Sequence, residues 1–192
     1  MPPQAVKTVR NQIYWQYSKI IADSAGVGSG NFAFVMNRFK KLQGGEIEWA
    51  GSIREYVKER ELPKACIYCG RKRNLSYDHL FPKNRGGPDI PDNVVLACKS
   101  CNSSKGDKCF YEWWFKGSSN RDLPRKELPP RVAEGKYLKL LYKLHEENGT
   151  LDAGRADMER LCQGCELKYL CDGTLLTVYC LESILRKKSQ GG

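Results

Sequence analysis

Apolar side chains recur with helical spacing near the start of the chain. Between residues 11 and 25 they fall at positions i, i+4, i+7 and i+8, the spacing that lines one face of a helix. The sequence therefore predicts a helix here, with an apolar face made by Ile13, Tyr17, Ile20 and Ile21.

Two further helices are predicted before residue 64. Asn31 is a residue type that caps a first helical turn, and Gly44-Gly45 would end the helix that follows it. The next helix is expected over residues 46–61, before Pro63. The buried positions would be Phe32, Val35, Met36 and Phe39 in one helix and Trp49, Ile53 and Val57 in the other.

The pattern changes in the middle of the chain. Residues 75–80 and 93–97 are short apolar runs typical of strands, and a loop rich in proline and glycine separates them. Helical spacing then returns from Asn102 to Gly117. The expected order is strand, strand, helix.

The polar, proline-bearing stretch 118–130 is the predicted internal boundary. After it, Pro130 is placed to begin a helix that ends at Gly149, and an amphipathic helix closes the chain. His145 is interpreted as a packing or surface residue. The predicted class is α+β, with a helical segment 1–63, a core 64–117 and a helical segment 118–192.

Composition and charge indicate which class of partner the protein binds. The net charge is +10, and residues 64–108 contribute nine Lys and Arg against four Asp, a net +5. A basic surface of this kind favours polyanions such as nucleic acid. No apolar run reaches the roughly 18 to 20 residues that cross a bilayer, and no signal peptide is evident at the start, so we expect a cytoplasmic protein without a membrane partner.

Nine cysteines in such a chain indicate metal binding rather than disulfides. Cys66 and Cys69 form one Cys-x-x-Cys knuckle, and Cys98 and Cys101 form a second. Four thiolates presented in this way satisfy a tetrahedral Zn²⁺ and leave no open position. This zinc is predicted to be structural.

The segment between the two knuckles contains the candidate catalytic and metal-binding residues. It contains Asp78-His79, then Asn93, and Asn102 follows the last cysteine. With the bracketing knuckles, residues 64–110 resemble the HNH endonuclease family, in the variant whose last histidine is replaced by asparagine. The resemblance implies a ββα-metal fold in which His79 activates water, Asp78 and Asn102 hold one Mg²⁺ or Mn²⁺ ion, and Asn93 orients the histidine and its loop.

The same chemistry follows from the residue types. A neutral imidazole can accept a proton near neutral pH, and one divalent ion can stabilise both the phosphoryl oxygens and the leaving oxygen. Adjacent side chains on a regular strand point to opposite faces, so Asp78 and His79 can share a site only if the strand bends or ends there. The basic side chains expected to contact phosphate are Arg85, Lys105, Arg71 and Lys83.

A second cysteine cluster follows near the end of the chain. Its four members could hold Zn²⁺ or a [4Fe–4S] cluster, and buried packing is the alternative. Cys109 is interpreted as a packing residue. The cluster consists of Cys162, Cys165, Cys171 and Cys180.

The sequence therefore favours a metal-dependent endonuclease that hydrolyses DNA, with duplex DNA as the preferred partner. A homodimer would explain how a single site cuts both strands. The alternative is a zinc-dependent nucleic-acid-binding module without catalysis, which would not need Asp78, His79 and Asn102 in register. A zinc deaminase is disfavoured because it needs an open zinc position and a nearby His-x-Glu motif, and no such motif lies near the two cysteine knuckles.

Overall fold

The computed structural model describes residues 3–48, 55, 59, 61–116, 128–157 and 177–188. It contains helices and one two-stranded antiparallel sheet, so the predicted α+β class is confirmed. The chain divides into two compact units: Met1–Arg54 with Leu141–Gly192, and Glu55–Leu140, each as far as it is described. Within the described ranges, no helix has both the length and the apolar character needed to span a membrane.

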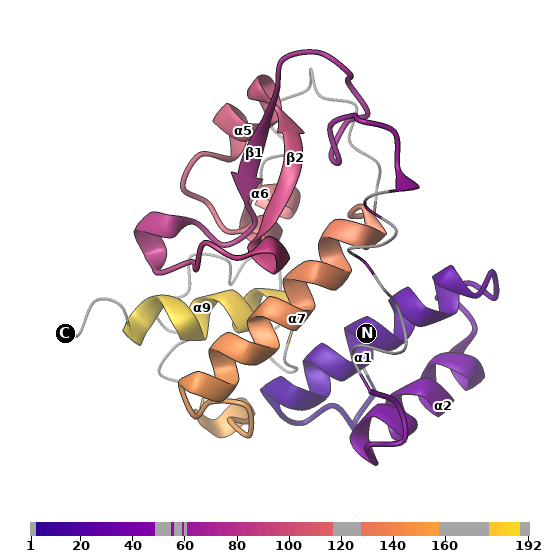
Figure 1. Cartoon of the computed structure of the whole chain (residues 1–192). Coiled ribbons are helices and arrows are strands. Elements are labelled where there is room, and N and C mark those ends of the chain that lie inside the picture. Colours follow the sequence, from indigo (N-terminus) through magenta and orange to yellow (C-terminus); the bar gives the residue numbers. More distant parts are fainter. Residues whose placement is uncertain are drawn as a thin grey trace. The chain divides into compact units, whose positions relative to one another are not determined.

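The first unit contains two helices that pack side by side, α1 (Val9–Ser24) and α2 (Phe32–Gln43) (Figure 1). Each begins at a polar cap. Thr8 accepts a hydrogen bond from the amide of Asn11 at 3.2 Å, and Asn31 accepts one from the amide of Phe34 at 3.0 Å. The predicted Asn31 cap and the predicted end at Gly44 are confirmed.

Most of the predicted apolar stripes are buried. Ile13, Tyr17 and Ile20 of α1 are enclosed, as are Val35 and Phe39 of α2. The prediction for Phe32 is wrong, because its side chain is 58% exposed. It stands at the first position of α2. Its ring is tilted relative to the ring of Trp15, and the two ring centroids are 5.9 Å apart.

The other end of the chain completes this unit. Helix α9 (Val178–Lys188) packs against α1, and Thr8 forms an isolated antiparallel bridge with Gly154. Arg10 forms an ion pair with Asp152 at 3.2 Å. His145 is fully buried and hydrogen-bonded, so its interpretation as a packing residue is confirmed and the surface alternative is wrong.

The second unit is built on a β-hairpin, with β1 (Leu75–His79) antiparallel to β2 (Val94–Cys98). The connection contains two short 3₁₀ helices, Lys83–Arg85 and Pro91–Asn93. Helix α5 (Lys99–Lys105) follows β2 directly and packs on both strands (Figure 1). The predicted strand, strand, helix order is confirmed.

The predicted single helix over residues 102–117 is wrong. Helix α5 ends at Gly106, which has φ +56°, and a separate helix α6 (Phe110–Lys116) follows. The amide of Gly106 bonds to the Asn102 carbonyl at 2.8 Å and closes the last turn of α5. A positive φ favours glycine and stops an L-residue helix.

Helix α7 (Arg131–Glu147) begins one residue after Pro130, as predicted, and continues from the second unit into the first. Within the second unit its Tyr137 ring packs on Phe110 and Tyr111 of α6. These contacts form an aromatic core beneath the hairpin, together with Tyr68, Trp113 and Trp114.

The helix predicted over residues 46–61 falls mainly outside the described residues, including Trp49, Ile53 and Val57. Residues 46–48 are not helical, so its predicted start is wrong. Glu55, Glu59 and Glu61 are helical.

Candidate active site and metal centre

Four cysteine sulfurs meet at one end of the hairpin. The Sγ atoms of Cys66, Cys69, Cys98 and Cys101 all lie within 4.8 Å of one another, and those of Cys69 and Cys98 are 3.7 Å apart. Zn–S bonds of about 2.3 Å in a tetrahedron place the sulfurs about 3.8 Å apart. The donor set and its spacing therefore fit Zn²⁺.

Different elements present the two knuckles. The first is a tight turn in which the amide of Gly70, at φ +77°, bonds to the Cys66 carbonyl at 2.8 Å. The second spans the end of β2 and the first turn of α5. A metal held here would tie the turn, the sheet and the helix together.

The four thiols influence one another strongly. The pKa of Cys66 is lowered to about 4, chiefly because the Cys101 thiol donates a hydrogen bond to it. The same contact raises the pKa of Cys101 far above its ordinary value. A cation at the centre would favour the thiolate form of all four, because each would then coordinate positive charge.

Asp78 and His79 line the same cleft at the end of β1. The strand stops at His79, so the alternation that would separate the two side chains ends there, as the sequence argument required. The cleft has a volume of about 380 Å³. Asn102, Lys105, Lys83 and Tyr77 also line it.

Asp78 is a buried carboxylate with two partners. The Tyr68 hydroxyl donates to Oδ2 at 2.6 Å, and the Lys105 ammonium donates to Oδ1 at 3.0 Å. The side chains of Asp78 and Lys105 are only 4% and 1% exposed, so the ion pair is almost fully enclosed. The pKa of Tyr68 is raised by burial and then by the charge of Asp78.

His79 is held from the opposite side. Its Nε2 lies 2.9 Å from Oδ1 of Asp89, and the other oxygen of Asp89 accepts from Lys83 at 2.9 Å. The pKa of Asp89 is lowered by its hydrogen bonds with Lys83 and His79. When the imidazole proton is on Nε2 it points to Asp89, which leaves the Nδ1 lone pair for another proton.

Asn93 is fully buried and holds the loop after His79. Its Oδ1 accepts from the amide of Phe81 at 2.7 Å, and its Nδ2 donates to the carbonyls of Phe81 and Pro88 at 2.9 and 2.8 Å. Gly87 belongs to the same loop. Its Cα lies so close to the Phe81 carbonyl oxygen that a Cβ at this position would clash with that oxygen. Asn93 thus fixes the loop, while the ring nitrogen of His79 bonds to Asp89.

Asn102 lies on the second turn of α5 and faces β1. Its Nδ2 donates to Oγ of Ser76 at 3.2 Å and to the carbonyl of Tyr77 at 3.1 Å. No donor from the described residues reaches its Oδ1. That oxygen and the Asp78 carboxylate are the ligand types that Mg²⁺ and Mn²⁺ accept.

The basic residues selected from the sequence have different surroundings. Lys105 is paired with Asp78, and Arg85 is partly buried beside Glu112 at 3.2 Å. Lys83 and Arg71 are exposed, although Lys83 is paired with Asp89 and Arg71 bonds to Ser100.

Tyr68 and Asp89 are site residues that the sequence did not reveal. Tyr68 stands inside a cysteine knuckle, and Asp89 is in the loop between the strands. The only signal is their position between residues of the motif.

The second cysteine cluster lies mostly outside the described residues, since Cys162, Cys165 and Cys171 are not among them. Cys180 is buried in α9 and accepts a hydrogen bond from the amide of Thr177. Cys109 is buried, in agreement with its packing role.

Comparison with known proteins identifies the segment that contains both the knuckles and the cleft. Residues 66–108 match the family model described as HNH endonuclease. Over 110 residues the chain is 30% identical to YoqL, an SPbeta prophage-derived protein of Bacillus subtilis (strain 168) that carries the name HNH endonuclease. Over 71 residues it is 34% identical to the CRISPR-associated endonuclease Cas9 of Corynebacterium diphtheriae.

These alignments are partial. They cover 51% of this chain and 44% of the Bacillus protein, and 35% of this chain and 6% of Cas9. The chain thus spans less than half the length of the curated relatives that it matches. No solved structure matches the chain significantly.

Proposed function

Because residues 66–108 of this chain form a domain of the HNH endonuclease family, we propose that the protein is a metal-dependent endonuclease that hydrolyses phosphodiester bonds in DNA. The observation that supports this most is the cleft at the end of β1, which brings together Asp78, His79 and Asn102. A general base and two oxygen ligands in one cleft are what single-metal phosphodiester hydrolysis requires.

In this proposal His79 is the general base. With its proton on Nε2 and donated to Asp89, the imidazole takes a proton from water at Nδ1. The Asp89 carboxylate then stabilises the imidazolium, since it already lies 2.9 Å from the ring. The hydroxide formed attacks phosphorus, the bond to the leaving oxygen breaks, and that oxygen takes a proton from solvent.

Asp78 and Asn102 would hold one Mg²⁺ or Mn²⁺ ion. When bound, such an ion would stabilise negative charge on the phosphoryl and leaving oxygens. Asn102 is pre-oriented, because its amide nitrogen bonds to β1 and turns its oxygen away from the strand. Tyr68 and Lys105 fix the Asp78 carboxylate, and the Lys105 ammonium also brings positive charge to the cleft.

Backbone phosphates would be neutralised mainly by exposed cations. Arg71 and Lys83 fit this role because they are exposed, whereas Arg85 is partly buried beside Glu112 and Lys105 is buried beside Asp78. Such binding weakens as salt increases, because each neutralised phosphate releases counterions. Duplex DNA remains the expected partner, and a homodimer that cuts both strands remains a prediction.

The test compares the wild type with His79→Ala on labelled DNA in the presence of Mg²⁺ or Mn²⁺. Loss of a general base is expected to lower the cleavage rate by about 100-fold or more, with zinc content and DNA binding unchanged. His145→Gln is the matched control, because His145 is the other histidine of the chain and lies in the other unit.

Equal cleavage by the wild type and His79→Ala would contradict the mechanism. Zinc-dependent DNA binding by a wild type that never cleaves would favour the non-catalytic binding module instead. In that case Asp78 and Lys105 would serve only as a buried structural pair.

A further inference from the structure

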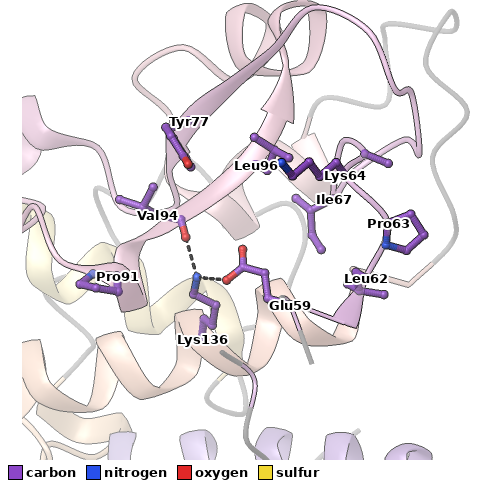
Figure 2. Close-up of a pocket in the computed structure, with 11 residues that line it drawn as sticks. Glu59, Leu62, Pro63, Lys64, Ile67, Tyr77, Pro91, Val94, Leu96 and Lys136 are labelled. Carbon is purple, nitrogen blue, oxygen red and sulfur yellow. Dashed lines mark hydrogen bonds and ion pairs between the residues drawn. The ribbon is translucent and has the colours of Figure 1, made fainter. Parts of the chain in front are cut away.

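A second cavity lies between the hairpin, the segment that contains Leu62 to Ile67, and helix α7 (Figure 2). Its volume is about 480 Å³, and all of its lining residues belong to the Glu55–Leu140 unit. We call it the β-face pocket. Its walls are mainly apolar and include Leu62, Pro63, Ile67, Val94, Leu96 and Tyr77.

The β-face pocket and the catalytic cleft share a lining residue. Tyr77 lines both cavities, and its side chain is 74% exposed. Tyr77 and His79 are two residues apart on β1, about 7 Å along the strand, and both line the cleft.

The strand register supports this proximity. Tyr77 pairs with Leu96 and His79 pairs with Val94, and both partners line the pocket. The proposed base on β1 therefore lies beside strand positions whose partners border the apolar pocket.

The polar groups within the pocket bond to one another. The Lys136 ammonium donates to Glu59 at 2.6 Å and to the carbonyl of Val94 (Figure 2). Apart from Lys64, the remaining lining is aliphatic, with one exposed aromatic ring. Such a surface suits a flat apolar group that stacks, rather than one recognised through hydrogen bonds at its edge.

Each cavity has an exposed lysine in its lining. Lys64 lines the pocket and Lys83 lines the cleft, and both side chains are exposed. A ligand that joins a flat apolar group to an anionic backbone matches this combination. A nucleotide is such a ligand.

We propose that the β-face pocket receives an unpaired nucleobase, stacked on Tyr77, from the DNA strand whose phosphate lies in the catalytic cleft. This inference rests on the proposed nuclease function and names a substrate class for it. A paired base must first leave the duplex stack, at an energetic cost, so DNA with an unpaired base beside the scissile phosphate is the preferred substrate. Stacking accepts every base, so little sequence preference is expected at this position.

The first experiment measures binding without cleavage. Full-length protein without added divalent metal is titrated into single-stranded DNA that contains 2-aminopurine, whose fluorescence falls on stacking. Tyr77→Phe keeps the ring and should bind as the wild type does, whereas Tyr77→Ala should lose about tenfold in affinity. Leu96→Glu, which places a charge in the pocket, should lose a similar factor. Melting temperature and zinc content verify that each variant folds.

The second experiment measures cleavage of two duplexes that differ at one nucleotide, which is either an unpaired base or an abasic sugar. The wild type should cut the duplex with the unpaired base faster, and Tyr77→Ala should remove the difference. Equal binding by Tyr77→Ala and Tyr77→Phe, or equal cleavage of both duplexes by the wild type, would overturn the pocket proposal.

The two experiments distinguish failure of the pocket proposal from failure of the nuclease proposal. Tyr77-dependent stacking without any cleavage would support the pocket and refute the nuclease, and cleavage without dependence on Tyr77 would do the reverse. Sedimentation tests a different occupant. If the wild type is a dimer and Leu96→Glu a monomer, the pocket is a contact between protein copies and the nucleobase proposal is wrong.

Discussion

At the scale of single residues, the site depends on how Asp78 is held. A buried carboxylate is tolerated only when it is paired and hydrogen-bonded. Its two partners come from the two parts of the four-cysteine scaffold, Tyr68 from the first knuckle and Lys105 from α5. The scaffold thus determines the direction in which a proposed metal ligand points.

This arrangement predicts the effect of Tyr68→Phe. The variant keeps the ring that packs on Trp113 at 4.8 Å but loses the 2.6 Å hydrogen bond to Asp78. Leaving the buried oxygen without its donor should cost about 1–3 kcal/mol of stability. The Mg²⁺ concentration that gives half-maximal cleavage should rise several-fold, at unchanged zinc content.

Tyr111→Phe is the matched control for Tyr68→Phe. Tyr111 is equally buried, and its hydroxyl donates to Glu134 at 3.1 Å rather than to the site. It should lose stability without a change in Mg²⁺ dependence. If Tyr68→Phe behaves in the same way, Tyr68 is only a structural residue.

Single residues also show what the sequence could predict. Asp78, His79, Asn93 and Asn102 could be selected because their spacing between two cysteine knuckles is visible in the chain itself. Tyr68 and Asp89 could not, because each meets its partner across ten residues. Such contacts depend on the path of a turn and a loop, which local pattern does not specify.

At the scale of elements, the strands were easier to predict than the helix that follows them. Two apolar runs bounded by turn residues can pair in few ways, whereas helical periodicity alone did not reveal the break at Gly106. The break has a consequence for the site. Because α5 ends there, Asn102 and Lys105 lie on one short helix anchored by Cys101.

The knuckles join elements that have little core of their own, and this predicts the effect of removing zinc. A chelator that extracts the metal should abolish hydrogen-exchange protection in β1, β2 and α5, because the four ligands connect the first turn to β2 and α5. Amides in α1 and α2, whose contacts are apolar and lie in the other unit, should stay protected.

Two cysteine variants serve as controls for the chelator experiment. Cys101→Ala removes a ligand and should reproduce the effect of the chelator without any chelator. Cys109→Ala changes a buried cysteine outside the cluster and should retain zinc. Unchanged protection of β1 and β2 after complete zinc loss would show that the aromatic core suffices to hold the hairpin.

At the scale of the whole molecule, the two ends of the chain meet in one unit. Arg10 bonds to Tyr142 and pairs with Asp152, a partner 142 residues away. Segments predicted in chain order could not show this, because local pattern carries no information about which distant helices associate. The first unit is thereby built from both ends, and the hairpin unit is inserted between them.

The first unit contains a buried histidine that should make its stability depend on pH. Burial lowers the pKa of His145 to about 4, against about 6.5 for an exposed histidine, although its hydrogen bond to the Leu181 carbonyl acts the other way. Between these two values the unfolded chain binds a proton that the folded chain does not, so the free energy of unfolding falls as pH falls. The contribution is fully present above about pH 6.5 and decreases towards pH 4.

Urea unfolding at several pH values tests this prediction. The wild type should lose about 2 kcal/mol between pH 7 and pH 5, a range above most carboxylate titration. The chain has only two histidines, which provides a direct control. His145→Gln should flatten the dependence, whereas His79→Gln, which alters a partly exposed ring beside Asp89, should retain it. An unchanged slope in His145→Gln would show that another group takes up the proton, and that the buried imidazole does not govern the acid sensitivity of this unit.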